Sequence, residues 1–138
     1  MNFPGIEALI RAEQARANGE FIKYAPIDVY LEKLKSKAEF VDHSVEGECA
    51  GFVAFYCNDY VGRIAFITLV LVSPEYRGLG ISKCLLRRVL DVCRSRDFEK
   101  CCLEVRANNV SAIRLYDSFG FTVTEDRKGA YLMTASLR

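Results

Sequence analysis

The sequence predicts an α/β protein in which helices flank a mixed, mostly antiparallel central sheet. Its length of 138 residues fits one domain, because domains usually contain about 100–150 residues. Apolar residues near the N-terminus recur with helical spacing, and the later segments alternate between strand and helix patterns. Two strand pairs followed by strand–helix–strand–helix order indicate one sheet with helices on its faces. We therefore expect residues 1–138 to form a single domain.

Two helices are expected near the N-terminus. Residues 4–18 follow helical spacing, with Pro4 in the first turn and Gly19 at the stop, where these residue types are favoured. Ile27–Lys37 form the second expected helix, and Pro26 suits its start.

The pattern then changes to that of strands. Glu39–Val45 and Cys49–Cys57 suggest a hairpin, because the turn signal Glu46–Glu48 separates them. Arg63–Val72 is a long run rich in β-branched residues, ended by Pro74. Such a run predicts a strand that is buried on both faces.

The second half alternates between the two periods. The expected elements are, in order, a helix, a strand, a helix and two closing strands: Gly80–Arg96, Cys101–Val105, Asn109–Phe119, Phe121–Thr124 and Tyr131–Leu137. The closing strands turn at Lys128-Gly129. The crossover through the first of these helices should be parallel and right-handed, as such crossovers almost always are.

The charge balance argues against several kinds of partner. With 19 basic and 18 acidic residues the net charge is +1, whereas a nucleic-acid binder needs a basic face over phosphates. No apolar run approaches the roughly 20 residues that span a bilayer. Met1–Ile10 lack the basic start and apolar stretch of a secretion signal. We expect a cytoplasmic protein with neither a nucleic-acid nor a membrane partner, and a homodimer stays open.

The six cysteines predict reduced thiols and no metal site. There is no Cys-x-x-Cys pair, and His43 is the only histidine, so the usual ligand spacing for zinc is missing. Cys84, Cys93 and Cys101 lie in apolar patterns, where a thiol behaves as a small hydrophobe.

The stretch Val72–Ser82 has the composition of a phosphate-binding junction. A strand runs into a loop with two glycines, and the loop opens a helix. The first amides of a helix have no partners within it and carry partial positive charge. Glycines at 78 and 80 let the backbone approach a bulky anion. A phosphate or pyrophosphate site is the chemistry that this pattern favours.

Three other interpretations compete for this loop. A Walker A loop needs Gly-Lys-Ser/Thr, and Ser82-Lys83 have the reverse order. A dinucleotide fingerprint has a third glycine or alanine where Lys83 stands and needs a shorter loop, although Glu104 at the end of the next strand would suit it. A loop that binds nothing is the third alternative.

Arg77-Gly78-Leu79-Gly80-Ile81-Ser82 resembles the Arg/Gln-x-x-Gly-x-Gly/Ala motif of the GCN5-related N-acetyltransferase (GNAT) superfamily. Val72-x-Pro74 and Leu85-Leu86 match the usual surroundings of that motif. Ser82 departs from it, because Gly or Ala is usual there. The resemblance implies that the loop amides hold the pyrophosphate of coenzyme A.

A second block resembles the same superfamily. It begins at Leu103–Asn109 and continues through Ala112, Leu115-Tyr116 and Gly120-Phe121, so the resemblance covers residues 68–124. It implies the acyl-CoA N-acyltransferase fold, in which the two parallel strands splay apart and the pantetheine arm pairs with backbone in the gap. The implied coenzyme-binding residues are Leu71, Val72, Arg77, Gly78, Leu79, Gly80, Ile81, Ser82 and Asn109.

The resemblance also implies two catalytic residues. Tyr116 would give a proton to the leaving thiolate, and Glu104 would be the base. The Leu-Glu-Val-Arg-x-x-Asn stretch closely resembles the branch of the superfamily that acetylates the N-terminus of a ribosomal protein, where that glutamate serves as base. The structural alternatives are a core tyrosine that caps a backbone carbonyl and a surface glutamate paired with Arg106 or Lys100. Asn109 would contact the coenzyme or cap its helix.

The expected activity is transfer of an acetyl group from acetyl-CoA to a primary amine. The acceptors considered are an amino sugar, an amino acid, a polyamine and a peptide N-terminus. The alternative is an acyl-CoA sensor that keeps the fold and has no turnover. Arg77, Lys83, Arg87 and Arg88 form a basic group around the loop, which suits either the coenzyme's 3′-phosphate or a solvated helix face.

Overall fold

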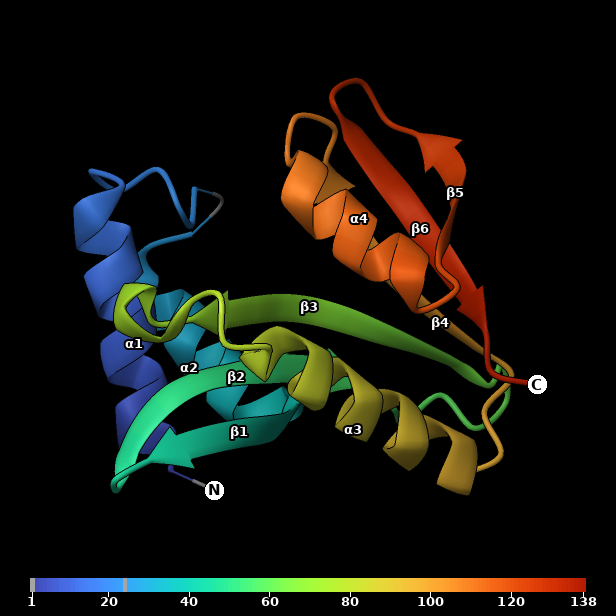
Figure 1. Ribbon diagram of the computed structural model, residues 1–138, viewed down its shortest axis with the longest axis horizontal. Helices are drawn as coiled ribbons and strands as arrows, with labels where there is room; N and C mark the ends of the chain where they lie inside the picture. Colours follow the sequence, from blue (N-terminus) through green and yellow to red (C-terminus); the bar gives the residue numbers. More distant parts are fainter. Residues whose placement is uncertain (1, 24) are drawn as a thin grey trace. The chain divides into compact units, whose positions relative to one another are not determined.

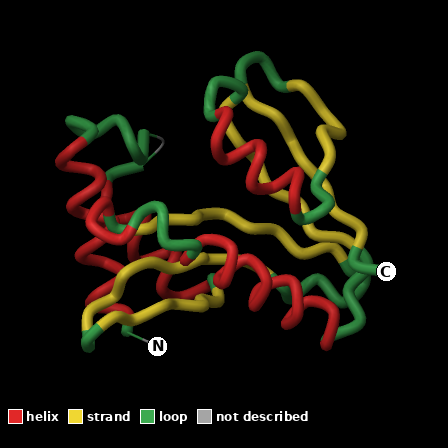
Figure 2. The backbone as a smooth tube through the Cα atoms, viewed as in Figure 1, coloured by secondary structure: helices red, strands yellow, loops and turns green. Residues whose placement is uncertain are grey.

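The computed structural model describes residues 2–23 and 25–138. The chain forms two compact units, Met1–Ala54 with Leu69–Leu86 and Phe55–Thr68 with Arg87–Arg138. The elements follow one another along the chain as Figures 1 and 2 show: α1 (Phe3–Arg16), α2 (Ile27–Lys37), β1 (Glu39–Val45), β2 (Glu48–Tyr56), β3 (Ile64–Val72), the 3-10 helix η1 (Pro74–Tyr76), α3 (Ile81–Ser95), β4 (Lys100–Arg106), α4 (Val110–Ser118), β5 (Thr122–Asp126) and β6 (Ala130–Ser136). Every helix and strand that the sequence predicted is present, with ends shifted by a few residues. The short helix η1 was not predicted.

The six strands form one sheet in the order β1-β2-β3-β4-β6-β5. β3 and β4 are parallel, whereas β4 pairs with β6 and β6 with β5 in antiparallel fashion. The predicted fold class, a mixed sheet flanked by helices, is confirmed. The chain-terminal strand β6 lies between β4 and β5, an order that the sequence pattern did not predict.

The parallel ladder is shorter than the strands that form it. It joins Ile64–Ile67 to Lys100–Leu103, while β3 continues to Val72 and β4 to Arg106. A ladder that stops before its strands end is what the expected splay of the parallel pair requires. The two strand ends belong to different compact units, so the predicted binding of pantetheine between them stays a prediction.

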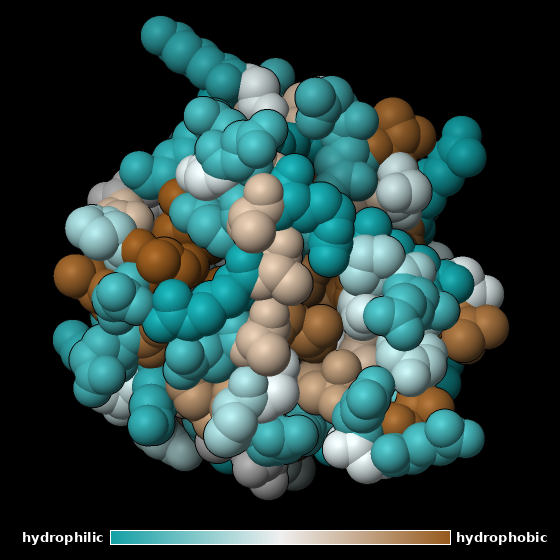
Figure 3. Space-filling model, turned by 90° about the vertical axis from the view of Figure 1, so that its left-hand side faces the viewer, coloured by the Kyte–Doolittle hydropathy of each residue, from teal (hydrophilic) through white to brown (hydrophobic). Residues whose placement is uncertain are grey.

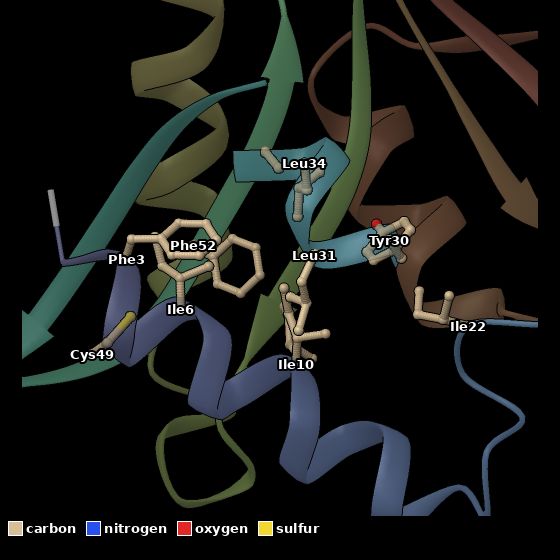
Figure 4. Packing of buried hydrophobic residues seen from close by; sticks show 11 residues of the cluster. Phe3, Ile6, Ile10, Ile22, Tyr30, Leu31, Leu34, Cys49 and Phe52 are labelled. Carbon is tan, nitrogen blue, oxygen red and sulfur yellow. The ribbon is translucent and has the colours of Figure 1, made fainter. Parts of the chain in front are cut away.

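In the first unit, α1 and α2 lie beside β1, β2 and the end of β3 (Figure 1). Asn2 caps α1, because its side chain accepts a hydrogen bond from the Gly5 amide at 3.0 Å. Figure 4 shows the buried cluster that joins these elements: Phe3, Ile6 and Ile10 from α1, Tyr30, Leu31 and Leu34 from α2, Cys49 and Phe52 from β2, and Ile22 from the loop between the helices. Each fully buried aliphatic or aromatic side chain contributes about 1.5–3 kcal/mol.

In the second unit, one face of β4 and β6 is buried. Leu103 lies opposite Met133 and Cys101 opposite Ala135, and all four are almost inaccessible to solvent. The ring of Tyr116, from α4, meets that of Phe121 edge to face, with centroids 6.0 Å apart. The alternation of buried and exposed residues along β4 is that of a sheet covered on one face.

The predicted burial of β3 on both faces is wrong for its first half. Ile64 and Phe66 are 44% and 36% exposed, whereas Ala65 and Ile67 between them are buried. In the second unit, Ile64 and Phe66 lie on the same exposed face of the sheet as Glu104. Phe66 pairs with Cys102, and Cys102 is two residues before Glu104 in β4. A β-branched run therefore indicated the strand correctly but not its exposure, which depends on what covers each face.

The cysteines are free thiols, as expected. Burial raises the pKa of the Cys57 thiol to about 12, so it is uncharged at neutral pH and unreactive. Cys93 and Cys101 are also buried, but Cys84 is exposed on α3. The apolar pattern around Cys84 did not predict that exposure.

Polar residues dominate the face of the molecule that Figure 3 shows. On the face that Figure 3 shows, hydrophilic side chains cover most of the area and apolar ones lie in separate small groups, as on most folded proteins. Among residues 2–23 and 25–138, no helix has both the length and the hydropathy to cross a bilayer.

Candidate functional site

The end of β3 is held close to β2. The Ser73 amide donates to the Ala50 carbonyl at 2.8 Å. A Cβ on Gly51 would lie 3.0 Å from the Leu71 carbonyl oxygen, so only glycine allows this approach without a shift. Sequence reasoning missed Gly51, although a glycine inside an apolar strand is a known signal of close backbone contact.

The glycine loop that follows (green between β3 and α3 in Figure 2) has a conformation that glycine favours. Gly78 and Gly80 have φ angles of +82° and +79°, in the left-handed region that residues with a Cβ rarely adopt. No heavy atom lies within 4 Å of a Cβ built on either of them. Leu79, between them, is 69% exposed. The loop backbone is therefore open on the side where a side chain would otherwise stand.

Helix α3 begins directly at this loop. The Cys84 amide donates to the Gly80 carbonyl at 3.2 Å, so the amides of Ile81, Ser82 and Lys83 precede the helical ladder and are available to a ligand. Ile81 is buried and anchors the first turn, while Ser82 is partly exposed. Amides ahead of a helix, next to an open glycine backbone, fit a phosphate or diphosphate.

Arg77 is engaged within the protein. Its Nε donates to the Val72 carbonyl at 3.1 Å, and its Nη2 lies 3.4 Å from a carboxylate oxygen of Glu13. The Glu13 side chain is only 16% exposed and also pairs with Arg16 at 2.6 Å. Arg77 therefore ties the loop to the end of β3 and to α1, a role that the sequence did not predict.

The other basic residues near the loop are exposed on α3. Arg87 lies over the ring of Phe119, with its guanidinium carbon 5.9 Å from the ring centroid. Lys83 and Arg88 complete this exposed group. A cationic face of this kind is compatible with both predicted roles, a contact to a phosphate and a solvated helix surface.

Tyr116, the predicted proton donor, is 8% exposed. Burial raises the pKa of its phenol to about 12, because the charged phenolate would lose its hydration. Within residues 2–23 and 25–138, no hydrogen bond to the hydroxyl is found, so the alternative in which it caps a backbone carbonyl is wrong for the described part of the chain. The side chain offers a protonated hydroxyl at neutral pH.

Glu104, the predicted base, is about half exposed and ion-paired. Its carboxylate lies 3.1 Å from Nη1 of Arg127, and its side chain is 48% accessible. The predicted alternative partners were Arg106 and Lys100, but the observed partner comes from the hairpin between β5 and β6. Arg127 also binds Glu125, and sequence reasoning missed both residues.

Asn109 is the N-cap of α4. Its side-chain oxygen accepts a hydrogen bond from the Ala112 amide at 3.3 Å, which satisfies one of the unpaired amides of the helix. The capping role is confirmed, and a contact with the coenzyme stays a prediction.

The predicted site residues divide between the two units. Leu71, Val72 and Arg77–Ser82 belong to the first, and Glu104, Tyr116 and Asn109 belong to the second. The first group offers a turn whose open backbone suits an anion, next to the last residues of β3. The second group offers a carboxylate and a protonated phenol, which suit proton acceptance and proton donation.

Comparison with known proteins points to one family. The model of the acetyltransferase (GNAT) family matches residues 6–121. The ribosomal protein bS18-alanine N-acetyltransferase of Escherichia coli (strain K12) is 37% identical over 81 residues, which are 59% of this chain and 55% of that protein.

Solved structures resemble nearly the whole chain. Ard1 from Thermoplasma volcanium is 26% identical with a TM-score of 0.79, over 99% of this chain and 93% of that one. The PaiA N-acetyltransferase from Thermoplasma acidophilum, in complex with coenzyme A, is 16% identical with a TM-score of 0.75, over 98% of this chain and 92% of that one. The second likeness shows the fold alone.

The chain spans about half the length of the curated relatives it matches. The matched segments are 60% of a Bacillus subtilis (strain 168) protein that is 34% identical and 55% of the Escherichia coli enzyme.

Proposed function

The chain belongs to the acetyltransferase (GNAT) family, and we propose that it transfers the acetyl group of acetyl-CoA to the N-terminal α-amine of a protein. Residues 1–138 act in this proposal as one acetyltransferase domain in the cytoplasm. Acetyl-CoA supplies the acetyl group as a thioester.

The observation that carries the proposal is the open glycine backbone ahead of α3. Gly78 and Gly80 both have left-handed φ angles with free space beside them. The amides that follow them are not yet part of the helical ladder. This arrangement suits the diphosphate of coenzyme A, and Leu71 and Val72 offer the backbone with which a pantetheine amide would pair.

A peptide N-terminus is favoured over the other acceptors for two reasons. The identity to an enzyme named as an alanine N-acetyltransferase of a ribosomal protein is 37% over 81 residues. An α-amine also has a pKa of about 7.7–8.0, against about 10.4 for a lysine-like amine. A useful fraction of an α-amine is therefore neutral at pH 7, so a half-exposed carboxylate is a sufficient base.

Two side chains move protons in the proposed reaction. The amine nitrogen bonds to the acetyl carbon and the bond from that carbon to sulfur breaks, while Glu104 accepts the proton that the amine loses. Tyr116 donates a hydrogen bond to the departing thiolate and then its proton. A phenol of pKa about 12 is a weak acid beside a thiol of about 8.5. Its transfer is therefore expected late, when the thiolate has lost its hydration.

The experiment is an acceptor screen that follows release of free coenzyme A. It includes a peptide with a free N-terminus, the same peptide with a blocked N-terminus and one internal lysine, an amino sugar, an amino acid and a polyamine. The free α-amine should react and the blocked peptide should not. Preference for a small amine would overturn the peptide assignment.

Calorimetry separates the remaining alternatives. Acetyl-CoA should bind and NADH should not, because the loop lacks the third small residue of a dinucleotide fingerprint. Tight acetyl-CoA binding with no coenzyme A release for any acceptor would favour the sensor without turnover.

A further inference from the structure

We propose that Arg127 is a positioning residue that holds Glu104 in the resting protein and releases it to the acceptor ammonium, while Glu125 retains the arginine. The inference deepens the proposed function and rests on it. It assigns a role to a residue of the β5–β6 hairpin that touches no reacting atom and acts through Glu104.

The contacts of Arg127 are unequal. Its Nη1 lies 3.1 Å from an oxygen of Glu104. Its Nε and its Nη2 each lie 3.1 Å from an oxygen of Glu125, one on each carboxylate oxygen. Two parallel contacts between a guanidinium and a carboxylate form the stronger and better oriented pair. The single contact to Glu104 is the one that Arg127 can give up.

The sheet places the two carboxylates on either side of one residue. Glu104 in β4 and Glu125 in β5 are both opposite Leu132 in β6. Neighbouring strands are about 4.8 Å apart, so the two glutamates stand two strand spacings from each other. Only a long forked side chain reaches both.

The backbone of Arg127 is fixed by a tight turn. Its amide donates to the Ala130 carbonyl at 2.7 Å. Lys128 and Gly129 have φ angles of +49° and +94°, the pattern of a two-residue hairpin turn. The side chain is 44% exposed. A backbone held by this turn, with a partly exposed guanidinium at the end of the side chain, suits exchange of one partner for another.

The electrostatics agree with the geometry. The hydrogen bond from Arg127 lowers the pKa of Glu125. The pKa of Arg127 is raised first by Glu125 and then by Glu104. Exposed ion pairs are weak and exchange readily. An acceptor α-amine arrives largely as an ammonium at neutral pH, and this cation can replace Nη1 of Arg127 beside Glu104. The bound ammonium loses one proton to water before it attacks, and Glu104 accepts the second proton as the amide forms.

The two partners of Glu104 then have opposite effects on acceptor binding. Without the arginine, as in Arg127→Ala, nothing competes with the ammonium for Glu104. Without Glu125, as in Glu125→Gln, the arginine pairs with Glu104 alone and competes more strongly. A purely structural ion-pair network predicts the same direction for both variants, because each loosens the same hairpin.

The test compares these variants by acceptor binding and by kinetics. Calorimetry with an α-amine peptide and coenzyme A, which cannot turn over, should show binding about threefold tighter for Arg127→Ala and about threefold weaker for Glu125→Gln, the size of a surface ion pair. The KM for the acceptor should follow, and the KM for acetyl-CoA should not change. Arg127→Lys should fall between the wild type and Arg127→Ala, because an ammonium head lacks the fork.

The chain offers a matched control. Arg138 also lies between two carboxylates, 3.3 Å from Glu99 and 3.7 Å from Asp97. Arg138→Ala and Glu99→Gln should leave acceptor binding unchanged. Thermal unfolding of every variant checks that it is folded.

The outcomes separate this inference from the proposed function. Weakened binding in both Arg127→Ala and Glu125→Gln, or no change in either, overturns the role of Arg127 while acetyl transfer stands. In a Glu104→Gln background both substitutions should lose their effect, and an effect that persists there also overturns it. Undiminished turnover in Glu104→Gln itself overturns the assignment of Glu104 as base and this inference with it.

Discussion

The glycine loop and the end of β4 contribute to the proposed site in different ways. At the loop, the useful atoms are backbone amides, and their arrangement follows from the φ angles of Gly78 and Gly80. At the end of β4, the useful atom is a carboxylate oxygen of Glu104, whose partner Arg127 is 23 residues away. The first feature is local and the second depends on how strands pair.

This difference explains how substitutions should act. A change in the loop alters the backbone itself, so no neighbouring side chain can compensate for it. A change near Glu104 alters an exposed network in which contacts can be exchanged. We therefore expect large effects from the loop and smaller, adjustable effects from the carboxylate network.

The largest effect is expected for Gly80→Ala. A left-handed residue with a Cβ costs about 1–2 kcal/mol, and relief of this strain would turn the amides away from the ligand. Acetyl-CoA affinity, measured by calorimetry, should fall roughly 30-fold, equivalent to about 2 kcal/mol.

Gly19→Ala is the matched control for this substitution. Gly19 has a φ of +81° and nothing within 4 Å of an added Cβ, but it lies between α1 and α2. It should lose similar stability and keep acetyl-CoA affinity. Equal acetyl-CoA affinities in the two variants would mean that the turn at Gly80 takes no part in coenzyme binding.

Tyr116→Phe should lower kcat at least about tenfold, the lower part of the range for general acid catalysis. Coenzyme binding should barely change, because only the hydroxyl is lost. Tyr60→Phe serves as control, since Tyr60 is 61% exposed in the turn between β2 and β3. Undiminished turnover in Tyr116→Phe would exclude the phenol as proton donor.

Burial of Tyr116 also predicts a dependence of stability on pH. Its pKa is raised to about 12, whereas an unfolded tyrosine ionises near about 10. Between these values only the unfolded chain releases the proton, so a contribution present below about pH 10 is lost as the pH rises towards 12.

Urea unfolding at pH 9, 10 and 11 measures this effect. Relative to Tyr116→Phe, the wild type should lose about 1 kcal/mol of unfolding free energy by pH 11. The comparison removes the contribution of the other tyrosines and lysines. Parallel curves for the two proteins would mean that the phenol is not buried in solution.

A smaller effect than at Gly80 or Tyr116 is expected at Arg77, where two explanations can be separated. If the hydrogen bond to Val72 matters most, Arg77→Lys should weaken acetyl-CoA binding as much as Arg77→Ala, by roughly fivefold, equivalent to about 1 kcal/mol. If the positive charge matters most, Arg77→Lys should bind as the wild type does. Glu13→Gln removes the ion pair alone and should change the affinity least.

Periodicity predicted the elements well, because each has a clear local signal. Pro26 and Gly19 border helices, and Glu46-Gly47 and Lys128-Gly129 both form turns with left-handed φ angles. The pattern failed on exposure. Ile64 and Phe66 have the residue types of a buried strand and are nonetheless 44% and 36% exposed, because burial depends on elements from elsewhere in the chain.

The amino-acid sequence alone was enough to locate the glycine turn ahead of α3, since glycine conformation and helix starts are local properties of the backbone. It was also enough to select Tyr116 and Glu104 through a family motif. The contact partners of the site residues could be identified only in the folded protein. Arg127 meets Glu104, and Arg77 meets Glu13, because strand register and helix packing bring distant segments together, and no local pattern of residues encodes such contacts.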